Sequence, residues 1–157
     1  MCALKRIVSG GQTGVDRGAL DAALALGFPC GGWCPAGRKA EDGAIPPRYP
    51  VAELGSADYA ARTRRNVLDS DGTLIIHFGE LIGGTLNTLR LCESLGKPFL
   101  LIDGDAINAK EAGARAAAFA NEKAIRVLNV AGPRESGHPG ACRYAEEVVS
   151  GILESVV

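Results

Sequence analysis

Apolar residues recur along this chain in two alternating patterns, short continuous runs and longer stretches with helical spacing. The run GTLIIHF at residues 72–78 is apolar on both faces, which is typical of a strand buried in the centre of a parallel sheet. The longer stretches repeat apolar residues every three or four positions, as Val15, Ala19 and Ala22 do before Gly27 ends the segment. The first pattern predicts strands and the second predicts helices.

The two patterns predict alternating strands and helices with one long interruption. We expect strands at residues 4–9, 28–33, 72–78, 98–102 and 124–131, of which 28–33 is the weakest because of its glycines. We expect helices at residues 15–26, 56–70, 85–95, 108–122 and 141–156. Strands that alternate with helices imply right-handed crossovers and a sheet covered on both faces. The sequence therefore predicts an α/β three-layer sandwich with a mostly parallel sheet of about five strands, in a single domain over residues 1–157.

The interruption is a proline-rich loop at residues 34–55. A loop of this length in a small α/β protein is usually a lid or a binding loop. It carries Arg38 and Lys39 beside Glu41 and Asp42. These charges predict either a clamp for phosphates or a solvated turn.

Glycines gather directly after three of the predicted strands. The chain has 21 glycines, with clusters at Gly10-Gly11, Gly83-Gly84 and around Gly132. Ligands of open α/β sheets bind beyond the carboxyl ends of the strands, where all three clusters fall. We therefore expect these loops to form one ligand site.

The first of these loops, SGGQTGVDRG at residues 9–18, has features of an anion site. Its glycines allow backbone amides to approach a ligand, and the helix that follows presents unpaired N–H groups that suit a phosphate. Thr13 can add a hydroxyl donor and Arg17 a charge, although the loop is neither a Walker A motif nor G-x-G-x-x-G. The alternative is a tight strand-to-helix turn capped by Thr13. Asp16 either caps the helix or contacts a sugar hydroxyl or a metal ion.

The other two loops offer similar chemistry. In the second loop Thr85 either caps the next helix or binds phosphate, and Gly83-Gly84 leave room for a ligand. In the third loop Arg134 is a candidate for a bidentate contact to an anion, with a solvated loop as the alternative.

Several other side chains have ordinary structural explanations. Trp33 and Tyr49 suit stacking on a base or pterin ring, but core packing is commoner for both. His77, at the end of a strand, is expected to be structural rather than catalytic, and His138 to lie on an exposed loop. The arginines of the second helix are interpreted as a solvated face, at Arg62, Arg64 and Arg65.

Composition excludes several classes of protein. The net charge is −1, with 17 basic and 18 acidic residues, so neither a nucleic-acid surface nor an anionic-membrane surface is indicated. No apolar run reaches the roughly 18 residues of a membrane span. The first residues lack the pattern of a signal peptide, so a cytoplasmic protein is expected. The five cysteines are scattered and odd in number, which favours reduced thiols, and Cys30 and Cys34 lack the further ligands of a metal site.

Four segments together resemble the molybdenum carrier family, and the resemblance covers nearly the whole chain: SGGQTGVDRGALDAAL, GGWCPAGRKAEDGAIPPRYP, RTRRNVLDSDGTLIIHFGELIGGTLNT and LNVAGPRES. That family is regarded as a circularly permuted branch of the SLOG, or lysine-decarboxylase-like, superfamily of Rossmann-like nucleotide-binding proteins. The resemblance implies a Rossmann-like fold and a molybdopterin-type or nucleotide ligand at the glycine loops. It implies that the pocket is lined by Gly10, Gly11, Gln12, Thr13, Gly14, Asp16, Arg38, Asp42, Gly83, Gly84, Thr85, Arg134, Glu135 and Ser136.

One departure from the superfamily concerns catalysis. Its phosphoribohydrolase members carry a P-G-G-x-G-T-x-x-E loop with a catalytic glutamate, whereas this chain has IGGTLNT, with Thr88 in the place of that glutamate. Permutation can bring another acid to the site, with Asp16 and Glu135 as candidates. No Ser/His/Asp set or metal motif has recognisable spacing, so no catalytic residue is assigned.

Three functions therefore stay open. The first is a binding or carrier protein for a phosphorylated small molecule, with molybdenum cofactor as the cargo that the resemblance implies. The second is a hydrolase of the N-glycosidic bond of a nucleotide, and the third is a nucleotide sensor. A homodimer or higher homo-oligomer is the assembly to look for first, although nothing in the sequence specifies it.

Overall fold

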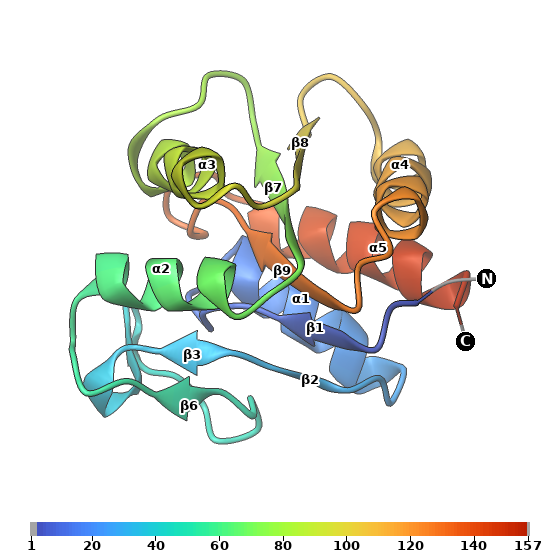
Figure 1. The fold of residues 1–157 in the computed structure, drawn as a ribbon. Coiled ribbons are helices and arrows are strands. Elements are labelled where there is room, and N and C mark those ends of the chain that lie inside the picture. Colours follow the sequence, from blue (N-terminus) through green and yellow to red (C-terminus); the bar gives the residue numbers. More distant parts are fainter. Residues whose placement is uncertain (1–2, 157) are drawn as a thin grey trace.

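The carboxyl ends of five parallel strands define one edge of the molecule in the computed structural model, which describes residues 3–156 (Figure 1). The central sheet has the order β2-β1-β9-β7-β8. Its strands are β1 (Arg6–Val8), β2 (Cys30–Gly31), β7 (Gly72–His77), β8 (Phe99–Asp103) and β9 (Val127–Ala131). All four pairings between neighbours are parallel. The predicted α/β fold class is confirmed.

Five α-helices cover the two faces of this sheet over residues 3–156. They are α1 (Val15–Ala25), α2 (Tyr59–Leu68), α3 (Gly83–Leu95), α4 (Ala109–Glu122) and α5 (Ala141–Glu154). The alternation of side chains along β7 separates the two layers. Leu74 and Ile76 belong to the large core beneath α1, α4 and α5. Ile75 packs on the opposite face, against Val67 of α2 and Cys92 of α3.

The strand order produces a crevice in the middle of the sheet. The chains that leave β1 and β9 enter α1 and α5 on one face, whereas the chain that leaves β7 enters α3 on the other. Because β9 and β7 are neighbours, their connections part at this point and leave space between them. The three predicted glycine loops follow β1, β7 and β9, so all three meet at this switch point.

The long loop is more structured than the sequence predicted. It contains a parallel pair, β3 (Trp33–Cys34) with β6 (Ala52–Glu53), a 3₁₀ turn η1 (Ala36–Arg38), and a hairpin of β4 (Lys39–Ala40) with β5 (Gly43–Ala44). A small second core lies beneath it, formed by Leu20, Cys34, Ala40, Ile45, Tyr49 and Val51. The expected strand 28–33 is interrupted at Gly32, where φ is 125° and a Cβ would lie 2.1 Å from the Ser9 carbonyl oxygen.

Two helix starts differ from the prediction. Helix α2 begins at Tyr59 because Asp58 is its N-cap, with the Asp58 carboxylate accepting from the Ala60 N–H at 3.0 Å. Helix α3 begins at Gly83 and has no side-chain cap. Cys30, Cys34, Cys92 and Cys142 are free thiols, and Cys2 lies outside the described residues. No helix within residues 3–156 is long and apolar enough to cross a membrane.

Candidate functional site

A cavity of about 630 Å³ lies at the switch point, between the loops after β1, β7 and β9 and the two helices α2 and α3. Six of the residues predicted for the site line it: Gly10, Gln12, Asp16, Gly84, Thr85 and Arg134. The other eight lie outside its lining: Gly11, Thr13, Gly14, Arg38, Asp42, Gly83, Glu135 and Ser136. Several of these eight hold the lining residues in place, as the contacts below show.

One wall of the cavity contains a buried ion pair between Arg62 and Asp16. Arg62 Nη1 donates to the Gly10 carbonyl oxygen at 3.0 Å and to Asp16 Oδ2 at 3.3 Å. The two side chains are only 11% and 10% exposed. Burial raises the pKa of the Asp16 carboxyl, and the Arg62 charge opposes that rise. The interpretation of Arg62 as part of a solvated face was therefore wrong.

Arg62 also explains the glycine at position 10. A Cβ there would lie 2.0 Å from Arg62 Nη1, so only glycine allows the guanidinium to lie against the loop backbone. The sequence did carry a signal for this arrangement. On α2, Arg62 and Asn66 are four residues apart and are buried on the same side as Val67, at positions where apolar residues are expected.

Gln12 places a buried hydrogen-bond donor without a partner at this wall. Its Oε1 accepts from the Thr13 N–H at 3.0 Å and from the Glu41 N–H at 2.9 Å. These two bonds fix the orientation of the amide, so the other end of the side chain is the NH₂ group. Within residues 3–156, Gln12 Nε2 has no hydrogen-bond partner, although the residue is only 6% exposed. A buried donor that stays unpaired is costly, so an acceptor on a ligand would stabilise this position.

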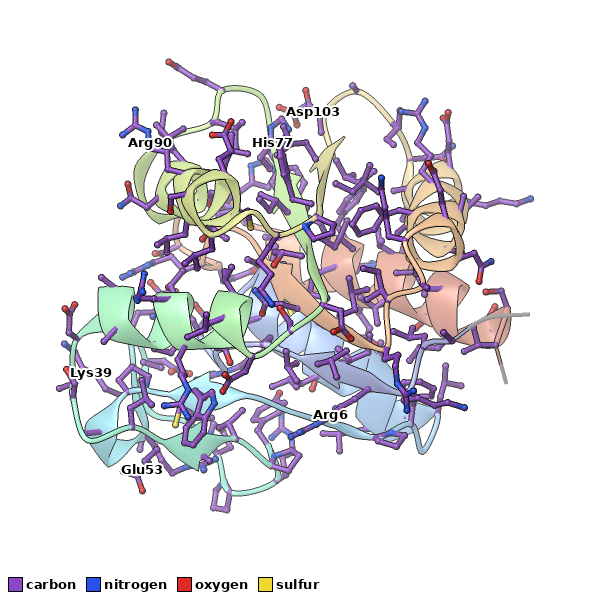
Figure 2. All side chains as sticks on the ribbon, in the orientation of Figure 1. Arg6, Lys39, Glu53, His77, Arg90 and Asp103 are labelled. Carbon is purple, nitrogen blue, oxygen red and sulfur yellow. The ribbon has the colours of Figure 1, made fainter. Side chains whose placement is uncertain are left out.

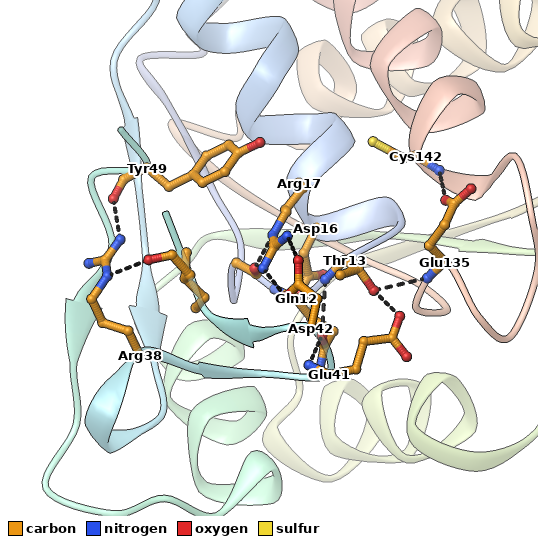
Figure 3. A network of polar contacts seen from close by, with 12 residues as sticks. Gln12, Thr13, Asp16, Arg17, Arg38, Glu41, Asp42, Tyr49, Glu135 and Cys142 are labelled. Carbon is orange, nitrogen blue, oxygen red and sulfur yellow. Dashed lines mark hydrogen bonds and ion pairs between the residues drawn. The ribbon is translucent and has the colours of Figure 1, made fainter. Parts of the chain in front are cut away.

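Glu41 joins three loops around the cavity, and we call its contacts the Glu41 clasp (Figure 3). Its carboxylate accepts from the Thr13 hydroxyl, and from the Ser136 hydroxyl at 2.5 Å and N–H at 3.3 Å. The Thr13 oxygen accepts in turn from the Glu135 N–H at 3.2 Å. Hydrogen bonds from Ser136 and Thr13 lower the pKa of the Glu41 carboxyl. The clasp thus positions the loops around the cavity.

The other charged residues of the long loop are also used within the protein. The two terminal nitrogens of Arg17 donate to the two oxygens of Asp42 at 2.6 and 2.8 Å, and this pair lowers the pKa of Asp42. Arg38 donates to four carbonyl oxygens of the long loop, at Ile45, Pro46, Tyr49 and Val51. Arg38 therefore organises the long loop internally, and Asp42 attaches that loop to Arg17 in the segment 9–18.

The three helices that follow the glycine loops differ in what their N-termini contact. At α1 the Val15 N–H donates to the Pro133 carbonyl oxygen at 3.1 Å. At α5 the Glu135 carboxylate accepts from the N–H groups of Gly140 and Cys142, at 2.7 and 2.9 Å. At α3 no side chain caps the first turn, and Gly84 and Thr85 line the cavity. The first turn of α3 is therefore the strongest candidate of the three for an anion.

Aromatic rings line the rim of the cavity. Phe78 stacks on His138 with ring centroids 3.8 Å apart. His138 lies in a loop as expected, but it is half-buried rather than exposed. His77, at the end of β7 beside Asp103 of β8, lines the cavity and contacts the Gly79 oxygen at 2.8 Å (Figure 2). Two amides that the sequence did not single out, Asn66 and Asn129, also face it.

Trp33 and Tyr49 lie outside the cavity lining. Tyr49 belongs to the core under the long loop, and its hydroxyl donates to Asp21 at 2.7 Å. Burial and the Asp21 carboxylate raise the pKa of Tyr49 to about 12. The Arg65 guanidinium lies over the Trp33 ring, 4.6 Å from its centroid. No group of three or more metal-binding side chains occurs within the described part of the chain.

A parallel sheet with a cavity at its switch point places the chain among the Rossmann-like α/β proteins. It belongs to the circularly permuted YpsA SLOG family, whose model matches residues 7–153. The crystal structure of a "putative molybdenum carrier protein" from Syntrophus aciditrophicus SB is similar, with 43% sequence identity and a TM-score of 0.93. That alignment covers 97% of this chain and 96% of the other. The family resemblance seen in the sequence is confirmed, and no curated protein matches the chain.

Proposed function

We propose that this protein binds a phosphate-bearing small molecule in the switch-point cavity and acts as its carrier, with a molybdopterin-type cofactor as the first candidate cargo and a nucleotide as the second. The observation that carries the proposal is the uncapped first turn of α3 in the wall of a cavity of about 630 Å³. Cavities of roughly 300–1,000 Å³ are typical of small-molecule sites. The name of the Syntrophus protein favours molybdenum cofactor among the phosphorylated candidates.

The lining fits a ligand that has a phosphate at one end and a polar ring at the other. The backbone N–H groups at Gly84 and Thr85, with the Thr85 hydroxyl, would hold the phosphate. The ring needs partners for its donors and acceptors. Asn129 lines the cavity and uses only one N–H, toward Thr73 at 3.3 Å, so its amide can supply both kinds. Asn66 also lines the cavity, but the Trp33 backbone already bonds to both of its amide atoms. The unpartnered Nε2 of Gln12 adds one further donor.

Hydrolysis of a nucleotide is the second candidate function, and Asp16 is the observation in its favour. Its buried carboxylate lies in the cavity wall, where it would stabilise positive charge that develops on a sugar. Its pairing with Arg62 weakens that ability, because the guanidinium already neutralises the carboxylate. Glu135, the other acid considered, caps α5 and lies outside the lining. Release of a free base from a panel of nucleotides would favour hydrolysis over carriage.

The test compares two glycine-to-glutamate variants that differ only in place. Gly84 and Gly55 both have open space where a Cβ would be added, and neither has a left-handed φ. Gly84→Glu adds a negative charge at the first turn of α3, whereas Gly55→Glu adds the same charge outside the cavity. Each gently purified protein is denatured, and the released small molecules are identified by mass spectrometry. An iodine-oxidised aliquot converts any molybdopterin to a fluorescent pterin.

We expect a pterin or a nucleotide at near-stoichiometric amounts in the wild type and in Gly55→Glu, and its loss in Gly84→Glu. A ligand that is retained in Gly84→Glu would exclude the α3 site. Failure of the wild type to release any ligand, and to bind added nucleotides or pterin phosphates, would refute the proposed function.

A further inference from the structure

We propose that Lys39 and Arg134 form a second anion-binding subsite at the rim of the cavity, which selects ligands that carry a diphosphate over those that carry a single phosphate. The inference rests on the proposed function and extends it to the class of ligand. It comes from a cluster of cations that neither the fold nor the α3 site explains.

Three cations from three different elements surround the ring of Tyr59, the first residue of α2. Lys39 Nζ lies 4.5 Å from the ring centroid, and the guanidinium carbons of Arg134 and Arg62 lie 5.4 and 5.5 Å from it. Because Lys39 Nζ and the Arg134 guanidinium carbon lie 4.5 and 5.4 Å from the same centroid, they are at most 9.9 Å apart. Tyr59, Arg62 and Arg134 line the cavity together with the first turn of α3, whereas Lys39 lies outside the lining and adjoins it through the Tyr59 ring.

Only one of the three cations forms a salt bridge within residues 3–156. Arg62 is paired with Asp16, whereas Lys39 and Arg134 make no salt bridge within residues 3–156. Cation–π contacts at exposed positions contribute about 0.5–1 kcal/mol, so they hold these side chains only weakly. The Arg134 charge interacts with the Glu41 carboxylate, so the cluster brings three positive charges beside the two carboxylates of Glu41 and Asp16. The excess of positive charge favours an anion at this place.

The backbone on both sides of this subsite is held in place. Lys39 lies between Arg38, which is bonded to four loop carbonyls, and Glu41, which makes the clasp. Arg134 directly precedes Glu135 and Ser136, which are the other end of the same clasp. The Glu41 clasp thus joins the two segments that carry Lys39 and Arg134. Groups held in place before the ligand arrives lose little freedom on binding, which favours affinity.

Figure 2 shows Lys39 on the side of the molecule where α2 begins. Of the two neighbouring cations in the long loop, Arg38 bonds to loop carbonyls, whereas Lys39 contacts the ring of Tyr59, which lines the cavity. A phosphate at the first turn of α3 leaves this subsite for a second phosphate. A diphosphate ligand occupies both the first turn of α3 and this subsite, and a monophosphate occupies only one of the two.

The experiment measures binding of inorganic pyrophosphate and of inorganic phosphate, and of ADP and AMP, by titration calorimetry. The variants are Lys39→Met and Arg134→Met, which keep an unbranched stem and remove the charge. The control is Arg64→Met, which removes the same charge from an exposed position of α2 outside the cavity. Thermal unfolding of each variant shows whether its fold is retained.

We expect the wild type to bind pyrophosphate and ADP at least about tenfold more tightly than phosphate and AMP, since a charge-assisted contact changes affinity by that factor or more. Lys39→Met and Arg134→Met should each remove most of this preference while reducing the affinity for AMP much less than the affinity for ADP. Arg64→Met should preserve the preference. Equal affinities for ADP and AMP in the wild type would refute the subsite and leave the proposed function standing. The subsite would also be refuted, with the proposed function left standing, if Lys39→Met and Arg134→Met reduced the affinity for ADP no more than Arg64→Met does. Failure of all four probes to bind would refute the subsite and count against a nucleotide as the cargo, whereas the released pterin decides the proposed function separately.

Discussion

Replacing Arg62 by Met tests how far the cavity wall depends on its buried ion pair. The substitution removes the guanidinium that donates to the Gly10 oxygen and to Asp16, and retains an unbranched stem that can lie against Gly10. Asp16 then keeps the Gln12 N–H at 3.2 Å but loses its ion-pair partner. The variant therefore leaves a buried carboxylate without the charge that compensates it.

The magnitude follows from the burial and geometry of the pair. Removing one partner of a buried ion pair typically costs about 3–5 kcal/mol. The Arg62–Asp16 distance of 3.3 Å is long for an ion pair, and Asp16 retains one donor, so we expect the lower end, about 3 kcal/mol. In a protein of this size that corresponds to a fall in Tm of roughly 6–12 °C. The double variant Asp16→Asn/Arg62→Met should recover about 1–3 kcal/mol relative to the sum of the single variants.

The loss should also depend on pH. Burial raises the pKa of Asp16 in the folded protein, and removal of Arg62 raises it further because an attraction is lost. A carboxyl with a raised folded pKa favours the folded state while it is protonated, and this contribution is lost as the pH rises through that pKa. The stability deficit of Arg62→Met should therefore be smaller at about pH 4 than at about pH 8. The stability deficit of the double variant Asp16→Asn/Arg62→Met should not grow between these two pH values, because it has no carboxyl at position 16.

The assay is urea unfolding, followed by the fluorescence of the single tryptophan, Trp33, and by circular dichroism. Coincident transitions justify a two-state free energy, and an unchanged slope assigns the difference to stability. Two results would refute the reasoning: a loss below about 1 kcal/mol in Arg62→Met, and single-variant losses that simply add in the double variant. Either would mean that the pair contributes little to the wall.

Three further changes test other parts of the structure. Glu41→Gln should change the free energy of unfolding by less than about 1 kcal/mol because Glu41 is exposed, but hydrogen exchange should speed up in the loops that the clasp joins. Since hydrogen bonds lower the pKa of Glu41, the wild-type clasp should likewise loosen as the pH falls through that pKa. Gly18→Ala should cost at least about 2 kcal/mol in urea unfolding, with Gly55→Ala as control, because its Cβ would lie 2.2 Å from the Cys142 oxygen of α5. Burial and the Asp21 charge raise the pKa of Cys142 to about 11, so mass spectrometry should find little alkylation of this thiol at about pH 8 until the protein is unfolded.

The fold could be predicted because its signals are local. Apolar runs such as residues 72–78 and the helical spacing from Val15 onward depend on neighbours in sequence, and the structure confirms both. The organisation of the long loop could not be predicted in the same way. Its strands have two residues each, and its order comes from Arg38, which bonds to carbonyls 7 to 13 residues away. Contacts of that kind leave no periodic pattern in the sequence.

The candidate site was predicted at the level of loops and less well at the level of side chains. The carboxyl ends of parallel strands meet at one edge, so the three glycine loops could be expected at the same edge. They are neighbours because the strand order places β1, β9 and β7 side by side, which the sequence did not predict. Which cation faces the cavity depends instead on the rotation of each element. Arg62 and Arg64 are two residues apart on α2, and one is buried in the wall while the other is exposed. Lys39 and Arg38 divide in the same way, one toward Tyr59 and the other into the long loop.

Glycine has the same sequence signature whether its missing side chain makes room for a ligand or for the protein itself, and the structure separates the two cases. At Gly14 a Cβ would lie 2.4 Å from the Pro133 oxygen, and at Gly11 it would lie 2.9 Å from the Ile45 side chain, so both glycines admit parts of the protein. At Gly84 nothing lies within 4 Å, although the residue lines the cavity. Substitutions at Gly11 or Gly14 would therefore disturb the packing between loops and report on folding. Gly84 is the position where loss of binding can be attributed to the ligand site, because its space is occupied by neither backbone nor side chain.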